Sequence, residues 1–202
     1  MAAVGTRVRA GRSATTIAVT GAAGPVGSRL IRQLAEYEDV RKVVAIDVEK
    51  PNNQADKRVT WRIADVRDPA LRTRLSGVDT IVHLATDRSI ETPPTQRRAL
   101  NVRGTDTVLA AAVAAGVRRV VVMTSAMVYG AEPDNAVPLP EDAPLRAEPD
   151  LTLVGDWVEM ERLTSRIGRA HPSLQGASPP PGSRPTAFPC RRGTTSAPCR
   201  ST

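Results

Sequence analysis

Aromatic side chains are scarce in this sequence of 202 residues, which has two Trp, two Tyr and one Phe. Nucleic-acid-binding surfaces combine clustered cations with aromatic stacking platforms, so this scarcity argues against a nucleic-acid partner. The net charge of +7 does not change that conclusion. All 21 acidic residues lie between residues 15 and 172, where Lys and Arg balance them, and the excess charge belongs to the two ends of the chain.

Cysteine is lacking from the body of the chain and occurs only at Cys190 and Cys199. Without a Cys-x-x-Cys pair a zinc site is not indicated, and no metal is expected. A cysteine-free body is typical of a cytoplasmic protein. Long apolar runs are lacking as well: none reaches the length of a membrane span or resembles a secretory signal. We therefore expect a cytoplasmic protein with no membrane partner.

The most informative segment that is present combines a short β-branched run, three glycines and a helical pattern. Residues 16–20 lead into Gly21-Ala22-Ala23-Gly24-Pro25-Val26-Gly27, and helical spacing begins at Ser28. In a dinucleotide-binding unit the first glycine permits the tight turn and the second lets the backbone approach a pyrophosphate. The third lets the helix pack closely on its strand. The free N–H groups of the first helical turn then face the anion.

An acidic residue stands at the distance that such a unit requires. Asp47 lies 20 residues beyond Gly27, at the end of a second strand-like run over residues 43–47. An ordinary βα turn is the alternative explanation for the glycines. The combination of strand, glycine turn, helix and distant acid favours a nucleotide site.

Strand-like runs alternate with helical patterns along the body of the chain. After the first two strands, we expect further strands at 59–63, 80–84 and 119–123, with helices near 69–75, 99–115 and 153–169. Near-continuous Val and Ile runs suit strands buried on both faces of a parallel sheet. The alternation predicts an α/β protein with a Rossmann-type doubly wound parallel sheet of about five strands, in the order 3-2-1-4-5.

One folded domain is expected between two tails. Residues 1–14 carry arginines and no acids and are predicted to be a disordered arm, with a transit peptide as the alternative. Residues 15–172 form the predicted NAD(P)-binding Rossmann domain. Residues 173–202 are predicted to be a disordered low-complexity tail. From residue 175 onward this tail has six prolines and no aliphatic side chain larger than alanine, which is too little apolar surface to offset the entropy of ordering.

Five short stretches carry a family resemblance. They are Thr-Gly-Ala-Ala-Gly-Pro-Val-Gly at 20–27, Asp-Val-Arg-Asp at 65–68, His-Leu-Ala at 83–85, Asn-Val-Arg-Gly-Thr at 101–105 and Thr-Ser-Ala-Met-Val-Tyr-Gly at 124–130. In this order and spacing they resemble the extended short-chain dehydrogenase/reductase family, in its NAD-dependent epimerase/dehydratase group. The resemblance covers roughly residues 15 to 172. It implies an oxidoreductase or epimerase that acts on a nucleotide sugar or a similar substrate.

The resemblance implies that a set of residues binds NAD, with NADP less favoured. The set is Gly21, Ala23, Gly24, Pro25, Val26, Gly27, Asp47, Asp65, Val66, Leu84, Ala85, Thr86 and Asn101. Asp47 would bind the adenosine ribose hydroxyls and repel a 2′-phosphate. Asp65 and Val66 would flank the adenine, residues 84–86 would pass beside the cofactor, and Asn101 would support the sheet edge behind the site.

Ser125 is the catalytic candidate that the resemblance implies, because it would lie near the nicotinamide and hydrogen-bond a substrate oxygen. A turn hydroxyl is the alternative role for Ser125. The corresponding alternatives are a helix N-terminal acid for Asp65 and a solvated helix residue for Asn101. His83 is expected to pack within its strand rather than act as a base or metal ligand.

The catalytic pair of the family is missing. Its chemistry needs a Tyr four residues before a Lys, because the ammonium lowers the pKa of the phenol and holds the nicotinamide ribose. No tyrosine here precedes a lysine at that spacing, and Lys57 is the last lysine. When Glu161 is aligned with the acid that usually follows the pair, Leu153 takes the Tyr place and Trp157 takes the Lys place. Neither side chain can transfer a proton.

The family pattern also stops early, at Leu174, where a sixth strand ending in Arg-Pro and a substrate lobe would follow. The chain is thus expected to be C-terminally truncated, through a shifted reading frame or as a natural disordered tail. Three functional classes stay open: an oxidoreductase or epimerase of unusual mechanism, a non-catalytic dinucleotide-binding or sensor protein, and an inactive fragment. The expected partners are a dinucleotide and a small-molecule substrate, and a homodimer is left open.

Overall fold

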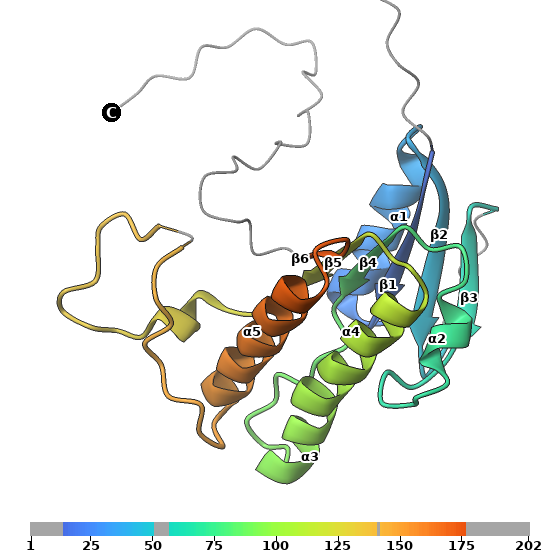
Figure 1. The fold of residues 1–202 in the computed structure, drawn as a ribbon. Coiled ribbons are helices and arrows are strands. Elements are labelled where there is room, and N and C mark those ends of the chain that lie inside the picture. Colours follow the sequence, from blue (N-terminus) through green and yellow to red (C-terminus); the bar gives the residue numbers. More distant parts are fainter. Residues whose placement is uncertain (1–13, 51–56, 141, 177–202) are drawn as a thin grey trace, which may run out of the picture.

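A parallel sheet with helices on both faces forms the body of the protein in the computed structural model, which describes residues 14–50, 57–140 and 142–176 (Figure 1). The predicted arm, except for its last residue, and the predicted tail from residue 177 onward lie outside the described residues. In chain order the elements are β1 (Thr15–Thr20), α1 (Pro25–Glu36), β2 (Val40–Asp47), β3 (Val59–Ile63), α2 (Leu71–Arg74), β4 (Thr80–His83), α3 (Pro94–Arg98), η1 (Ala99–Arg103), α4 (Gly104–Ala114), β5 (Arg119–Val122), η2 (Ala126–Tyr129), α5 (Leu153–Ala170) and β6 (Gln175–Gly176).

The strands lie in the order β3-β2-β1-β4-β5-β6, and every neighbouring pair is parallel. This confirms the predicted Rossmann-type order 3-2-1-4-5. Because all strands are parallel, their carboxyl ends lie at one edge of the sheet. The order reverses between β1 and β4, and ligands of such sheets bind beside that point.

The short strand β6 was not predicted. Gln175 pairs with Arg119 at the start of β5, and the Gln175 N–H donates to the Arg118 carbonyl at 2.7 Å. Leu174, directly before it, is 4% exposed and joins the core. The folded part therefore reaches residue 176 and not the predicted residue 172, because Leu174 is large enough to bury on the sheet.

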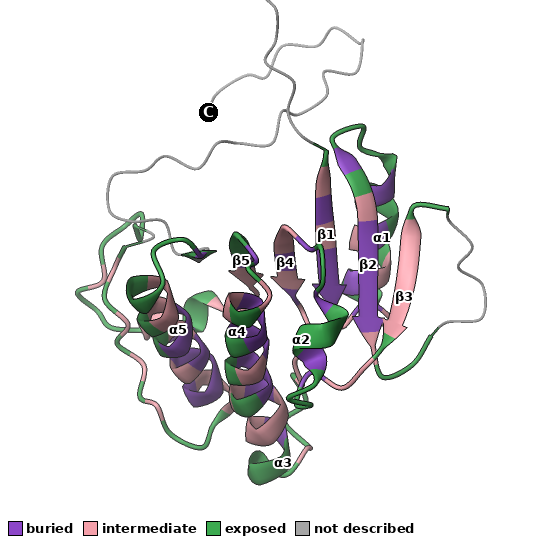
Figure 2. Ribbon diagram, turned by 45° about the vertical axis from the view of Figure 1, so that its right-hand side comes forward, coloured by how far each residue is buried: buried purple, intermediate pink, exposed green. Residues whose placement is uncertain are grey.

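Two separate cores lie on the two faces of the sheet. On one face, Ile31 and Leu34 of α1 pack on Val19 and Val43 of the strands. Ile31 and Leu34 stand three residues apart, so both lie on one apolar stripe of the helix. On the other face lie α2, α4 and α5, whose buried sides turn toward the strands (Figure 2). The strands β1 and β2 are buried on both faces, as their continuous Val and Ile runs predict.

The helix expected over residues 99–115 is longer and less regular than predicted. It begins with α3, where Pro94 stands in the first turn, passes through the π-helical turn η1, and continues as α4. The helix expected near 69–75 is a single turn, α2. The helix expected at 153–169 is α5, which begins where the Thr152 hydroxyl accepts a hydrogen bond from the Gly155 N–H.

Candidate nucleotide-binding site

The glycine turn joins β1 to α1 at the carboxyl edge of the sheet. Gly21 has φ +68°, and a Cβ atom there would lie 2.7 Å from the backbone nitrogen of Ala85. A Cβ atom on Gly27 would lie 2.1 Å from the Gly21 carbonyl oxygen. Neither position admits a side chain, so both glycines are required by the close approach of backbone segments.

The start of α1 leaves donors available to an anion. Gly24 is the N-cap and provides no side-chain acceptor, Pro25 is the first helical residue, and the first turn contains no acid. A Cβ atom on Gly24 would meet only the Gly21 carbonyl oxygen, at 3.4 Å, so the space beside this residue is open. The first N–H groups of a helix lack partners within the helix and attract negative charge.

Asp47 is tied directly to the glycine turn. Its Oδ2 accepts a hydrogen bond from the Ala23 N–H at 2.8 Å, and its Oδ1 accepts one from the Val48 N–H at 2.8 Å. The side chain is half-buried at the carboxyl end of β2. Two groups that lie far apart in the sequence, the turn and its distant acid, are therefore held together with the carboxylate fixed in orientation.

Asp65 and Val66 follow β3 at the same edge but differ in environment. The guanidinium of Arg67, 2.6 Å from the Asp65 carboxylate, lowers the pKa of that carboxyl through its hydrogen bond. Val66 is 4% exposed and belongs to the core, so only its backbone can meet a ligand. Asp65 Oδ1 accepts the Arg67 N–H, whereas Asp68 Oδ1 accepts the Ala70 N–H directly before α2.

The segment after β4 lies against the glycine turn. The Thr20 hydroxyl oxygen accepts hydrogen bonds from the N–H groups of Leu84, at 3.2 Å, and Ala85, at 3.4 Å. The next residue, Thr86, has a buried hydroxyl that meets no hydrogen-bond partner among the described residues. Because buried polar groups are nearly always satisfied, this hydroxyl points to an absent partner at the edge of the sheet.

His83 lies beneath this segment and is fully buried. Its Nδ1 is 2.7 Å from the Thr20 hydroxyl and its Nε2 is 3.1 Å from the Thr105 hydroxyl. The Thr105 hydroxyl in turn donates to the Asn101 carbonyl. Burial lowers the pKa of His83 to about 4, so the imidazole is neutral near pH 7. With both ring nitrogens engaged, His83 packs within the strand and links it to α4.

Asn101 is buried in the π-helical turn and holds the loop that follows β4. Its Oδ1 accepts the Asp87 N–H at 2.8 Å, and its Nδ2 donates to the Asp87 carbonyl at 2.9 Å. It is therefore not a solvated helix residue. The side chain fixes the backbone one residue beyond Thr86, and so positions the candidate site from behind.

A buried ionic cluster, absent from the sequence analysis, joins Asn101 to α5. Asp156 is fully buried and accepts from Arg97 Nε at 3.0 Å, Arg98 Nη1 at 3.2 Å and Asn101 Nδ2 at 3.3 Å. Arg97 also donates to the Leu151 carbonyl at 2.7 Å. No spacing in the sequence connects residues 97 and 156, and charged side chains are ordinarily expected outside the core.

The two positions aligned with the missing catalytic pair lie at the start of α5. Leu153 is the first residue of the helix and is half-buried, while Trp157 is 5% exposed. The Arg88 guanidinium lies over the Trp157 ring, 5.7 Å from its centroid, in a cation–π contact. Trp157 packs in a small cluster with Val128 of η2. Trp157 is thus a buried core side chain, and its correspondence with the lysine of the family stays a prediction.

Ser125 follows β5 at the same edge of the sheet. Its hydroxyl oxygen accepts a hydrogen bond from the Met127 N–H at 3.3 Å and caps η2. The neighbouring Thr124 hydroxyl donates to Glu161 on α5 at 2.5 Å. The hydroxyl of Ser125 serves the turn, and its catalytic role stays a prediction.

The described residues contain no group of three His, Cys, Asp or Glu side chains that could hold a metal ion. Within the same ranges, no helix has the length and apolar character needed to cross a membrane.

The sheet order and the glycine turn place this chain in the class of Rossmann-type α/β proteins. The profile of the NAD dependent epimerase/dehydratase family matches residues 17–150. The chain belongs to that family, as the five sequence stretches predicted.

The matches with curated relatives include most of this chain but only a minor part of each relative. The Uncharacterized protein Rv0501 of Mycobacterium tuberculosis is 30% identical over 166 residues, which make up 78% of this chain and 44% of that protein. A Putative dihydroflavonol 4-reductase of Synechocystis is 31% identical over 120 residues, 58% of this chain and 34% of that protein. The chain therefore spans less than half the length of these relatives.

Solved structures of nucleotide-sugar enzymes resemble this chain as well, and the chain spans a little over half of each. The dTDP-glucose 4,6-dehydratase DesIV from Streptomyces venezuelae, solved with NAD and TYD bound, is 30% identical with a TM-score of 0.69. The match covers 80% of this chain and 54% of DesIV. A UDP-galactose 4-epimerase is 26% identical with a TM-score of 0.67, over 80% of this chain and 55% of that chain.

Proposed function

We propose that this protein binds NAD(H) in preference to NADP(H) at the carboxyl edge of its sheet. The observation that carries the proposal is the hydrogen bond between Asp47 and the Ala23 N–H, which fixes a carboxylate beside the glycine turn. A carboxylate in that place suits two ribose hydroxyls and opposes the charge of a 2′-phosphate. The NAD bound in the similar dehydratase DesIV supports the choice of ligand.

The residues at this edge fit the cofactor. The N-terminus of α1 at Gly24, Pro25, Val26 and Gly27 would hold the pyrophosphate. Asp65 and the Val66 backbone would flank the adenine. Leu84, Ala85 and Thr86 would line the central part, and the unpartnered hydroxyl of Thr86 would gain a polar partner. Bound NAD supplies the capacity to accept or donate a hydride.

Titration calorimetry with NAD⁺ and NADP⁺ tests the proposal. Replacement Asp47→Ala should weaken NAD⁺ binding by about 1–3 kcal/mol, because hydrogen bonds to a charged group are lost. The matched control is Asp106→Ala, which removes the same charge from the exposed side of α4. Tighter binding of NADP⁺ than of NAD⁺ by the unchanged protein would refute the preference.

We further propose that the proton-transfer route of the family does not operate here. Leu153 and Trp157 occupy the two positions, and a missing general acid/base lowers the rate by roughly 10²–10⁴-fold. His83 cannot replace it, since it is fully buried and both of its ring nitrogens are bonded to threonine hydroxyls. The protein then acts as a non-catalytic dinucleotide binder that descends from oxidoreductases or epimerases of nucleotide sugars.

The alternative is an oxidoreductase of unusual mechanism in which Ser125 binds a substrate oxygen. Hydride transfer to or from a panel of nucleotide sugars and alcohols, followed by the absorbance of NADH, separates the two functions. Ordinary turnover that Ser125→Ala abolishes would establish the enzymatic alternative. Absence of turnover in a protein that binds NAD⁺ would leave the binding function.

A further inference from the structure

A hollow of about 450 Å³ lies at the amino-terminal edge of the sheet. Its walls come from the beginnings of β1 and β2, from most of the length of β3, and from the turn at Ser76 and Gly77 before β4. The glycine turn lies at the opposite, carboxyl end of β1. None of the lining residues belongs to the proposed NAD site, so the hollow is separate from that site. Its volume falls within the range of small-molecule sites.

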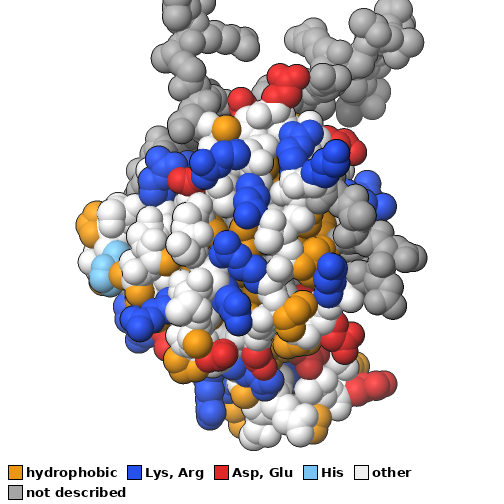
Figure 3. All heavy atoms as spheres, turned by 90° about the vertical axis from the view of Figure 1, so that its right-hand side faces the viewer, with side chains coloured by type: hydrophobic (Ala, Val, Ile, Leu, Met, Phe, Trp, Pro, Cys, Tyr) orange, Lys and Arg blue, Asp and Glu red, His pale blue; other side chains and the backbone are white. Residues whose placement is uncertain are grey.

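The lining of this basic hollow has one sign of charge. Among the described residues, its lining contains no acidic side chain and five cationic ones: Arg41, Lys42, Lys57, Arg58 and Arg62. Figure 3, which looks at the side of the molecule formed by β3 and α2, shows Lys and Arg side chains gathered on that face. A concave surface with one sign of charge concentrates ions of the opposite sign.

The local backbone directs an additional cation toward the hollow. The register between β1 and β2 shifts at Thr15 and Thr16, which leaves Arg41 as the extra residue of a bulge. Its Nη2 donates to the Thr16 hydroxyl at 2.8 Å. Thr16 is also the residue of β1 that pairs with Lys42. Arg41 and Lys42, although adjacent in sequence, therefore both reach the same hollow.

The contacts around the hollow offset only part of its positive charge. Arg62 donates to the backbone carbonyl of Arg74, which is a neutral acceptor. Asp79 stands outside the lining, where its Oδ2 accepts from the Thr16 N–H at 2.9 Å and its Oδ1 accepts from Arg118 at 2.8 Å. The Thr16 contact above all, together with the charges of Arg118 and Arg41, lowers the pKa of Asp79. Asp79 therefore offsets some of the charge of Arg41 from outside the hollow.

We propose that the basic hollow binds a small anion with two or more linked phosphoryl groups. Several cations spread over β2, β3 and the residues just before β3 match a multivalent anion better than a single phosphate or carboxylate, and Arg pairs well with phosphoryl oxygens. No aromatic side chain of the described residues lines the hollow, so this part of the chain offers no stacking platform of the kind that binds nucleic acid. The phosphoryl chain belongs to a free oligophosphate or to the tail of a nucleotide.

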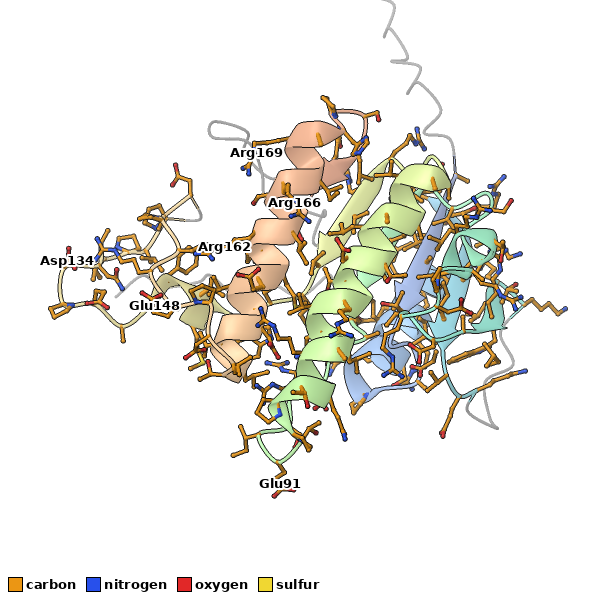
Figure 4. The ribbon with its side chains drawn as sticks, turned by 60° about the horizontal axis from the view of Figure 1, so that its bottom comes forward. Glu91, Asp134, Glu148, Arg162, Arg166 and Arg169 are labelled. Carbon is orange, nitrogen blue, oxygen red and sulfur yellow. The ribbon has the colours of Figure 1, made fainter. Side chains whose placement is uncertain are left out.

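The test is calorimetric titration of the full chain with tripolyphosphate, ATP and adenosine, in the presence of saturating NAD⁺. The double variant Lys42→Gln/Lys57→Gln should weaken tripolyphosphate binding by about tenfold or more, because two charged contacts are lost. The matched control, Arg162→Gln/Arg166→Gln, removes two positive charges from α5, at the other end of the sheet from β3 (Figure 4). It should change the affinity by less than about twofold. Unchanged Tm values establish that both variants are folded.

The outcomes separate the sources and the competing explanations. Equal affinities for tripolyphosphate and ATP, with no binding of adenosine, would assign recognition to the phosphoryl chain. Tighter binding of tripolyphosphate would identify a free oligophosphate as the ligand, and tighter binding of ATP would identify a nucleotide. An equal loss in both double variants would mean attraction by overall charge and would overturn the proposal. It would also fall if a single-stranded oligonucleotide bound more tightly with increasing length.

Discussion

The two halves of the sheet differ in how they hold their functional edge. In the half formed by β1, β2 and α1, the edge is shaped by backbone contacts that only glycine allows, at Gly21 and Gly27. In the half formed by β4, β5 and α5, the edge is held by buried polar and charged side chains around Asn101 and Asp156. The first half carries the residues of the proposed dinucleotide site. The second half carries Leu153 and Trp157 at the two positions that the sequence alignment assigns to the catalytic pair of the family.

This contrast suggests separate tests for the proposed cofactor binding and the proposed loss of proton transfer. The glycine turn and Asp47 are held by contacts among β1, β2, α1 and the segment after β4. None of these contacts involves Leu153 or Trp157, which stand at the start of α5. The following predictions test each half separately.

The largest effect is expected from the buried ionic cluster. Asp156→Ala should destabilise the fold by about 3–5 kcal/mol, because the buried Arg97 guanidinium loses its counter-ion. Urea unfolding measures the change. In the control Asp106→Ala, the partner Arg166 is exposed, and the loss should stay below about 1 kcal/mol. Equal losses in the two variants would show that the cluster does not hold this half together.

The second effect is a pH dependence that arises from His83. In the unfolded chain this histidine takes up a proton near pH 6.5, whereas in the folded chain it does so only near pH 4. Between these values the unfolded state binds more protons, so stability falls as the pH is lowered. The full loss amounts to about 3 kcal/mol. Between pH 7 and pH 4, the free energy of unfolding should change less with pH in His83→Gln than in the unchanged protein. An equal change in both proteins would contradict the assignment to His83.

The third effect tests the half that depends on glycine. Gly27→Ala forces a Cβ atom against the Gly21 carbonyl and should cost about 1–3 kcal/mol of stability. NAD⁺ binding should fall with it, because the start of α1 must move. Gly24→Ala is the matched control, since its Cβ atom has room, and it should change stability by less than about 1 kcal/mol. If both variants unfold alike, the steric difference between the two glycines is not decisive.

The smallest effect on stability is expected from the exposed side of α5, away from both edges of the sheet. Arg162 is exposed and pairs with Glu159 one helical turn earlier at 3.2 Å. Arg162→Ala should change the free energy of unfolding by about 0.5 kcal/mol or less. A loss comparable to that of Asp156→Ala would mean that the second half depends on surface charge as much as on its buried cluster.

Much of the first half could be predicted from the sequence because its signals are local. The spacing of Gly21, Gly24 and Gly27 encodes a turn whose geometry few other residues allow, and Asp47 follows at a set distance. The strand order follows from alternating elements and the right-handed rule for crossovers. These features require no knowledge of which distant side chains meet.

The tertiary structure alone decided the features that depend on contacts between distant segments. Asp156 and Arg97 carry charges that suggest exposed positions, and their burial becomes favourable only when α3 and α5 are packed side by side. The basic hollow likewise exists only because parallel strands bring Arg41, Lys57 and Gly77 to one edge. The sequence by itself determined the family, the order of the strands and the turn at the carboxyl edge, because backbone geometry and hydrophobic patterning are local. Which charges would meet, and where, depended on packing over long distances in the chain.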